Sequence, residues 1–290
     1  MLVARVWGLM ATLRDSDRRA LVKLLSDDDA TVLQLLEERF LEMGPDGLAF
    51  LESVARDAAP DARRGAHRIL HTIRERDVFD AFARFCAGRG TSFDLEAGCW
   101  LLAKTRYPEL DTAAYQARLD QMARELKARL TGRETPRATI EVCNRYFFRR
   151  LGFRGNEEDY YDPDNSYLNR VLDRRLGIPI SLSVVYLLAG RRLGLPLHGV
   201  SMPGHFLLKW HAAGNEFFID AFNEGQVLHE EDCKEMCEQM GHGFRPTYLA
   251  VVNSRQVLLR TCRNLHAIYL ERDTARAEQF GRFIALLARS

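Results

Sequence analysis

The sequence predicts an α+β protein whose strands lie in one section between helical parts. Apolar residues recur at the three- and four-residue spacing of amphipathic helices from Leu21 to about Leu130, and this spacing returns over 251–288. Residues 197–220 instead alternate apolar and polar side chains, which is typical of strands with one buried face. A helical first half, a strand section and a helical end therefore define the fold class.

The composition indicates a globular chain. Of its 290 residues, 47% are hydrophobic, enough to bury one large core or several small ones. Its 41 basic and 40 acidic side chains leave a formal charge of +1, so we expect no nucleic-acid partner and no membrane partner. No stretch approaches the roughly 20 apolar residues of a membrane span, and residues 1–19 are predicted to form a helix. The six cysteines are too sparse for a disulfide scaffold, which favours a cytoplasmic location.

We predict three domains. The stretch TGRETPRAT at 131–139 interrupts the helical pattern with Gly, Pro and Thr and marks the first boundary. Residues 1–135 are then an all-α domain of helical-repeat (HEAT-like) type, because DDATVLQLL and PDARRGAHRIL lie about 32 residues apart. Residues 136–250 form the α+β core, and 251–290 a C-terminal helical hairpin that resembles a tetratricopeptide (TPR) unit.

The strand section has the most specific geometry. The segments HFLLKW (205–210) and EFFID (216–220) flank HAAGN, which predicts an antiparallel hairpin with its turn at 212–215. In that register His211 faces Glu216. Alternation then gives one apolar face, made of Phe206, Leu208, Trp210, Phe217 and Ile219. The other face carries His205 and Asp220 as diagonal neighbours, at roughly 7 to 8 Å, where a carboxylate can hydrogen-bond an imidazole.

A helix is predicted to begin in GIPISLSVVY, residues 177–186. Proline is favoured in the first helical turn, so Pro179 indicates the helix start. Ser181 then lies among the free backbone N–H groups of that turn, which can stabilise an oxyanion. A histidine oriented by a carboxylate is the supporting half of a nucleophilic triad, which makes Ser181 a candidate nucleophile. Alternatively, Ser181 and Ser183 only satisfy backbone groups at the helix start.

Two stretches carry a family resemblance: the run GNEEDYYDPDNSYLNRVLDRRLGIPISLSVVYLLAGRRLGLPLHGVSMPGHFLLKW and the later FFIDAFNEG. They resemble the bacterial transglutaminase-like family of the core-2 type, and the similarity extends from about Phe93 to about Leu270. The resemblance implies a papain-like core in which a helix bearing the nucleophile at its N-terminus packs on an antiparallel sheet that supplies His and then Asp. Members commonly carry a helical N-terminal region and a TPR-like tail, and they include invasion regulators; a related domain occurs in a eukaryotic F-box protein.

The resemblance places the family histidine on His205 and the aspartate on Asp220, but it places Pro179 at the position of the catalytic thiol. Two hypotheses follow. In the first, the chain has lost the thiol chemistry and is a binding or regulatory module for a protein or peptide partner, with a cleft lined by His205 and Asp220. In the second, it is a hydrolase or acyl transferase with Ser181 as nucleophile, His205 as general base and Asp220 as its orienter.

Other residues offer weaker candidate sites. Asn165 and Asn169 are candidate binding residues, together with Pro179 at the thiol position; alternatively, their loop uses the two amides to hold its own shape. Cys233 and Cys237 lie one helical turn apart, with His229 and His242 nearby, a set that suits either zinc or a hydrophobic core. Because no CxxC pair is present, we predict no metal, and we expect no cofactor.

Overall fold

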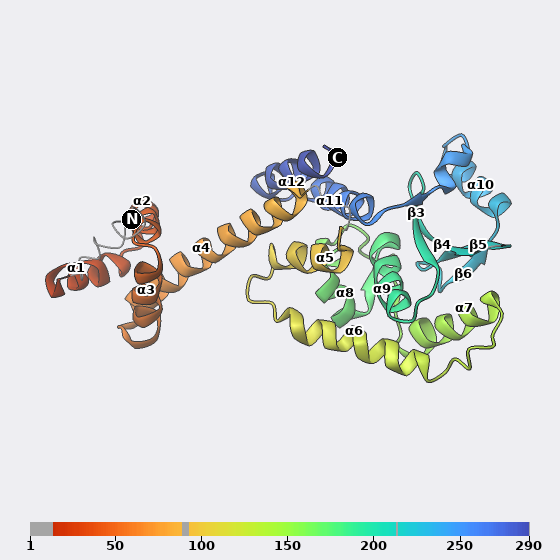
Figure 1. The fold of residues 1–290 in the computed structure, drawn as a ribbon. Coiled ribbons are helices and arrows are strands. Elements are labelled where there is room, and N and C mark those ends of the chain that lie inside the picture. The colour runs from red at the N-terminus through yellow and green to blue at the C-terminus, as the bar shows by residue number, and fades with distance from the viewer. Residues whose placement is uncertain (1–13, 89–92, 213, 290) are drawn as a thin grey trace, which may run out of the picture. The chain divides into compact units, whose positions relative to one another are not determined.

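A computed structural model describes residues 14–88, 93–212 and 214–289 (Figure 1). The chain divides into two compact units, an N-terminal unit (1–79) and a C-terminal unit (80–290). The boundaries predicted near 135 and 250 lie inside the C-terminal unit and remain predictions. Most of the helix predicted over residues 1–19 falls outside the described residues. Within the described residues, the first helix begins at Asp15.

The N-terminal unit is built from helices: α1 (Asp15–Leu25), α2 (Ala30–Glu42), α3 (Pro45–Asp57) and the first part of α4 (Pro60–Ala87). The Asp29 carboxylate caps α2 by accepting the N–H groups of Thr31 and Val32 at 2.7 and 3.4 Å. The core of this unit is apolar, and its most buried side chains include Leu25, Phe40, Leu51, Ala62 and Ala66. The helical spacing of the first half is thus confirmed here.

The C-terminal unit contains the remaining helices. They are α5 (Leu95–Lys104), α6 (Thr112–Lys127), α7 (Pro136–Asn144), α8 (Leu168–Arg174), α9 (Pro179–Arg192), α10 (Glu230–Gln239), α11 (Ser254–Leu270) and α12 (Thr274–Leu287). Short turns of other helix types are η1 (Arg145–Arg150), η2 (Pro163–Asn165) and η3 (Pro246–Leu249). Within the described ranges, no helix is both long and apolar enough to cross a membrane.

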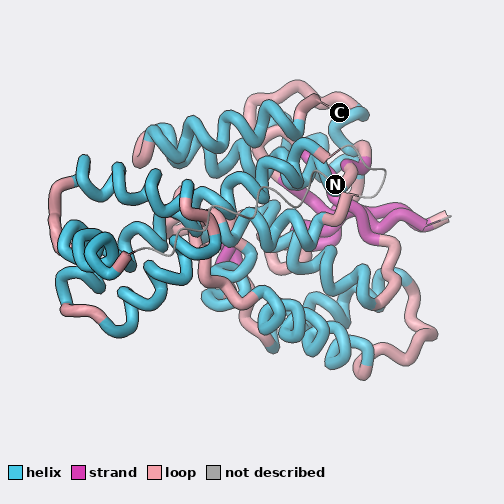
Figure 2. The backbone as a smooth tube through the Cα atoms, turned by 60° about the vertical axis from the view of Figure 1, so that its left-hand side comes forward, coloured by secondary structure: helices cyan, strands magenta, loops and turns pink. Residues whose placement is uncertain are grey.

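All strands of the described residues lie in the C-terminal unit (Figure 2). A five-stranded antiparallel sheet has the order β6-β5-β4-β3-β7. Its strands are β3 (Leu197–Ser201), β4 (Phe206–Ala212), β5 (Asn215–Asp220), β6 (Gln226–Leu228) and β7 (Val251–Val252). A separate parallel pair joins β1 (Arg154–Gly155) to β2 (Leu176–Gly177). The hairpin register is confirmed, because His211 pairs with Glu216, and the fold is α+β as predicted.

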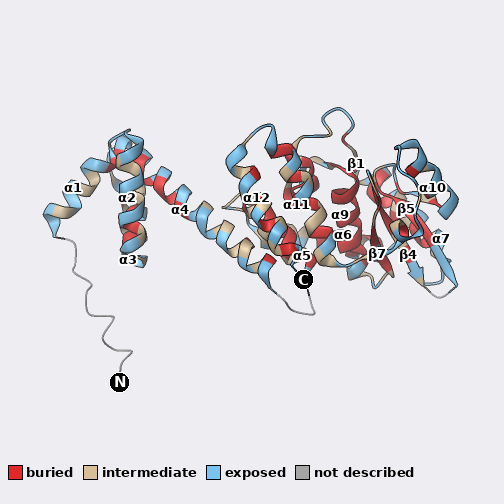
Figure 3. Ribbon diagram, turned by 90° about the horizontal axis from the view of Figure 1, so that it is seen from above, coloured by how far each residue is buried: buried red, intermediate tan, exposed pale blue. Residues whose placement is uncertain are grey.

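Helix α9 packs against one face of the sheet and forms its central support. All of its residues from Pro179 to Gly190 are buried, and Figure 3 shows this helix in the colour of buried residues. A helix with apolar residues on every side has to be surrounded by other elements. The predicted apolar hairpin face, from Phe206 to Ile219, belongs to the same core cluster as α9. The opposite face buries Leu207 and Phe218 against Cys233 and Cys237 of α10. The sheet is therefore covered on both sides.

Candidate functional site

His205 and Asp220 form a buried hydrogen-bonded pair at the edge of the hairpin. His205 lies just before β4, after Gly204, whose φ of +71° turns the chain into the strand, and Asp220 ends β5. The imidazole Nε2 lies 2.8 Å from Asp220 Oδ2. The two residues are 7% and 1% exposed, so little water competes for this bond. The register of the hairpin thus brings together the two residues that the sequence proposed as partners.

The turn after β5 stabilises the Asp220 carboxylate in its charged form. Oδ1 accepts the backbone N–H groups of Phe222 and Asn223 at 3.0 and 3.3 Å, and Oδ2 accepts the Asn223 side-chain amide at 2.8 Å. Burial raises the pKa of Asp220, but the hydrogen bond and charge of His205 together with the Asn223 amide outweigh burial, so the pKa lies below its usual value. The carboxylate therefore stays ionised and orients the imidazole, which leaves Nδ1 as the ring nitrogen available to a ligand.

The two serines near the start of α9 are buried. Pro179 is the first residue of the helix and is buried, as the sequence predicts for the helix start. The Ser181 hydroxyl accepts the Ile178 N–H at 3.0 Å and donates to the Ile178 carbonyl at 3.1 Å. Ser183 is completely buried, and its hydroxyl has no hydrogen-bond partner among the described residues. Ser181 therefore belongs to the first turn of the helix, and Ser183 faces the buried interior.

Phe222 connects the His205 side of the site to the strand pair beside α9. Its ring lies edge-on to the imidazole, with centroids 6.3 Å apart. A Cβ added to Gly155 would come within 2.6 Å of the same ring, so glycine permits this close approach. Gly155 in turn pairs with Gly177, and a Cβ there would lie 2.6 Å from the Ser181 hydroxyl. Small residues thus let the helix start, β1 and Phe222 pack closely.

Asn144 at the end of α7 provides a second connection between α9 and the His205–Asp220 pair. Its Oδ1 accepts the Tyr186 hydroxyl of α9 at 3.0 Å, and its Nδ2 donates to the Gly225 carbonyl at 2.6 Å. The Gly225 N–H donates in turn to the Asp220 carbonyl at 2.8 Å. Gly225 has a φ of +78°, and an added Cβ would collide with the Asn144 amide. Sequence reasoning did not find Asn144; the only local signal was the Asn-Glu-Gly turn after Asp220.

None of the six cysteines has the properties of a catalytic thiol. All are free and buried. Burial raises the thiol pKa to about 12 for Cys86, Cys99 and Cys233 and to about 11 for Cys143, and it also raises the pKa of Cys237 and Cys262. Because the thiolate is the reactive form, burial and the raised pKa disfavour reaction at these side chains. No set of three His, Cys, Asp or Glu side chains in the described ranges is arranged to hold a metal ion.

The two predicted binding asparagines are buried near the η2 turn. The Asn165 amide is fully used within its own loop: it accepts from Asn156 at 2.9 Å and donates to the Asp159 and Tyr160 carbonyls at 2.7 and 3.2 Å. Asn169 on α8 is 3% exposed, and its Oδ1 has no partner in the part of the chain that is described. No hydrogen bond joins either amide to His205 or Asp220 within those residues.

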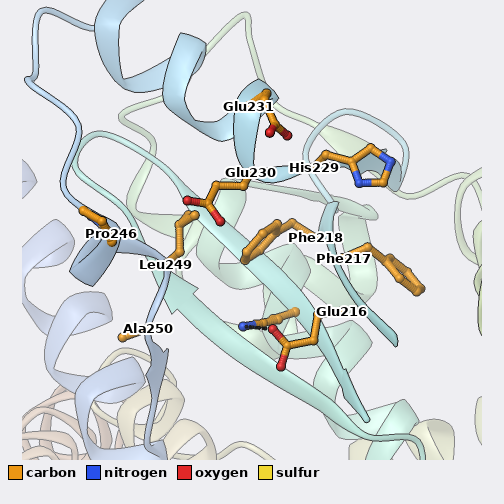
Figure 4. Close-up of a pocket in the computed structure, with 10 residues that line it drawn as sticks. Glu216, Phe217, Phe218, His229, Glu230, Glu231, Pro246, Leu249 and Ala250 are labelled. Atoms are coloured by element: carbon orange, nitrogen blue, oxygen red, sulfur yellow. Dashed lines mark ion pairs between the residues drawn. The ribbon is translucent and has the colours of Figure 1, made fainter. Parts of the chain in front are cut away.

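A cavity of about 400 Å³ lies on the α10 side of the sheet (Figure 4). His229 of the candidate zinc set lines it, whereas Ser181, His205 and Asp220 do not. Phe218 and Leu249 line it, and the Glu230 side chain extends from the start of α10 toward it. Lys209 pairs with Glu216 at 2.8 Å at its margin. The one lysine that lines this cavity therefore already has a carboxylate partner.

Comparison with known proteins identifies relatives of this chain. The model of the transglutaminase-like superfamily, core-2 type, matches residues 113–263, just over half of the chain. A UPF0162 protein of Xylella fastidiosa is 38% identical over 179 residues, which is 60% of this chain and 64% of that protein. A UPF0162 protein of Vibrio cholerae is 29% identical over 175 residues, 58% of this chain and 64% of its own length. Human F-box only protein 21 is 35% identical over 170 residues, 56% of this chain and 25% of that protein.

No solved structure matches the chain. The chain covers less than two thirds of the length of the Xylella relative, so the similarity concerns a part of that protein. The region of this chain that the family model matches, 113–263, contains α9, the hairpin and the His205–Asp220 pair described above. The chain belongs to the transglutaminase-like superfamily.

Proposed function

We propose that this protein is a transglutaminase-like protein without the thiol nucleophile, and that it serves as a binding or regulatory module through its His205–Asp220 site. One observation carries the proposal: at the start of α9, where the family resemblance assigns the thiol to position 179, the residue is Pro179, and the Ser181 hydroxyl is bonded to the Ile178 backbone. The raised pKa of every thiol supports it further, because no cysteine elsewhere can take over the role.

The second candidate is a hydrolase or acyl transferase that uses Ser181, His205 and Asp220. The intact His205–Asp220 pair favours it, since that pair is what a serine nucleophile needs as its base. Against it, an attacking serine donates its proton to the base, whereas the Ser181 hydroxyl donates to a carbonyl of its own turn.

The remaining parts of the chain suit a module that binds a protein or peptide. Helices α11 and α12 pack as a C-terminal pair, and α1 to α4 are consecutive helices. We propose that the pair acts as a TPR-like surface and that α1 to α4 act as a helical-repeat surface for the partner. Six free cysteines fit a cytoplasmic location. We propose no cofactor.

Covalent labelling tests the proposal. The full chain, Ser181→Ala and His205→Ala are treated with a serine-directed fluorophosphonate and, separately, with iodoacetamide, and intact masses are measured. We expect no adduct on the folded protein and six alkylated cysteines only after denaturation. A fluorophosphonate adduct that disappears in Ser181→Ala and decreases in His205→Ala would establish the serine enzyme instead.

A further inference from the structure

Arg260 on α11 is a half-buried cation without an acidic partner. Its Nη1 donates to the Met202 carbonyl at 3.3 Å and lies 3.5 Å from the Ser201 hydroxyl. The structure gives no hydrogen-bond acceptor for Nε or Nη2, and no carboxylate within 4.0 Å of the guanidinium, among the residues it describes. Most of the donors of this side chain are therefore available.

Other well-packed arginines of the same unit differ from Arg260. Arg192 binds Glu96 at 2.8 Å and Asp120 at 2.6 Å, and Arg174 binds Asp162 at 2.6 Å. Burial lowers the pKa of Arg260, and the nearby Tyr160 only partly offsets this. Because burying a charge without an opposite charge is costly, an unpaired guanidinium at this depth points to an anion supplied from outside the chain.

Arg260 lies beside the His205–Asp220 pair. The Met202 carbonyl that accepts from Arg260 also accepts the His205 N–H at 3.4 Å. On the other side, the ring of Tyr160 is 6.1 Å from that of Phe222, which itself lies edge-on to His205. Met202 therefore links Arg260 to the backbone of His205, and Phe222 links the His205 imidazole to Tyr160.

The aromatic contacts continue to the outside of the molecule. Tyr161 packs edge-on against Tyr160, with centroids 5.4 Å apart, and is 67% exposed. An exposed aromatic ring next to a half-buried cation offers an apolar contact and a charged contact to one ligand.

We propose that Arg260 binds a carboxylate group of a peptide ligand at the His205–Asp220 site. The planar guanidinium can hold a carboxylate through two parallel hydrogen bonds, His205 Nδ1 offers a second polar contact, and Tyr160 and Tyr161 accept an apolar side chain. This inference rests on the proposed function as a binding module. The carboxylate comes either from the C-terminus of the peptide or from an acidic side chain, and the experiment separates these sources.

Isothermal titration calorimetry on the full chain provides the test. The probes are N-acetyl-Ala-Tyr with a free C-terminus, the same peptide as a C-terminal amide, and N-acetyl-Glu-Tyr amide, which has only a side-chain carboxylate. We expect at least one carboxylate peptide to bind about tenfold or more tightly than the neutral amide. The one that binds more tightly identifies the source of the carboxylate.

Three variants locate the effect. Arg260→Gln should remove the preference for the carboxylate, whereas Arg263→Gln, which changes an exposed arginine one turn along the same helix, should change affinity by less than about twofold. Arg260→Lys, which keeps the charge without the fork, should retain part of the preference. Circular dichroism verifies that each variant is folded; if Arg260→Gln is not, the Arg260→Lys and Arg263→Gln comparison decides.

Several outcomes would overturn the inference. They are equal binding of acids and amide, no binding of any probe, equal losses in Arg260→Gln and Arg263→Gln, or tighter binding of inorganic phosphate than of the peptides. These results are distinguishable from failure of the proposed function, because a serine adduct is detected by mass and leaves carboxylate binding measurable by calorimetry.

Discussion

The two halves of the candidate site differ in completeness. At the hairpin edge, His205 and Asp220 are joined at 2.8 Å, and the carboxylate is held by three further donors. At the start of α9, Pro179 occupies the position that the family resemblance assigns to the thiol, and Ser181 is bonded to its own turn. The difference shows that the two halves depend on separate local structures, namely a hairpin with its following turn and a helix cap. One half can therefore persist after the other has changed.

The largest effect is expected from breaking the hairpin half. Asp220→Asn replaces a buried acceptor of four hydrogen bonds with an amide that opposes several of its donors, so the free energy of unfolding should fall by about 3 kcal/mol. Urea denaturation measures the change. Glu224→Gln is the matched control, because Glu224 is an acid of the same turn whose ion pair with Arg149 is exposed. Equal losses in the two variants would contradict the account.

The same substitution should have a defined pH dependence. The folded-state pKa of Asp220 is lowered, so its ionised form stabilises the fold fully above the ordinary value of 3.8, and this contribution is lost as pH falls through the folded pKa. The difference in unfolding free energy between the parent chain and Asp220→Asn should therefore be large near neutral pH and shrink below about pH 4. A difference that grows toward acid pH would reverse the assigned sign.

Smaller effects are expected at the helix half, where the two serines form a matched pair. Ser181→Ala removes both hydrogen bonds to Ile178 and should lower the unfolding free energy by about 1 kcal/mol. Ser183→Ala removes a buried hydroxyl without a partner among the described residues, so stability should stay unchanged or rise slightly. Urea denaturation of both variants provides the comparison, and the opposite order would show that the Ser181 hydroxyl is not part of the cap.

Much of the hairpin half was predictable from the sequence. Its register follows from local rules, namely alternation of side chains and a turn at 212–215, and the register alone makes His205 and Asp220 neighbours. Pro179 likewise marks the start of α9, because its effect on the backbone is local.

The surroundings of the pair were not predictable in this way. Asn144 of α7 contacts the Gly225 carbonyl and Arg260 of α11 contacts the Met202 carbonyl, and only tertiary packing brings these residues together. Nothing in the spacing of an asparagine or an arginine on a helix indicates which distant backbone carbonyl it will contact. The cap formed by Ser181 was predictable only in part. Its position in the helix was predicted, whereas its two hydrogen bonds to Ile178 depend on the side-chain rotamer.

We infer that the His205–Asp220 half is intact and that only the nucleophile is missing. Pro179→Cys tests this most directly, because it installs a thiol at the position where the family resemblance places one, in a chain whose own six cysteines are buried. The rate of iodoacetamide alkylation at position 179 is measured by intact mass, with and without His205→Ala. We expect a reactive thiol at position 179 whose alkylation slows by about tenfold or more without His205. Alkylation at the same rate in both backgrounds, or an unreactive thiol, would contradict it.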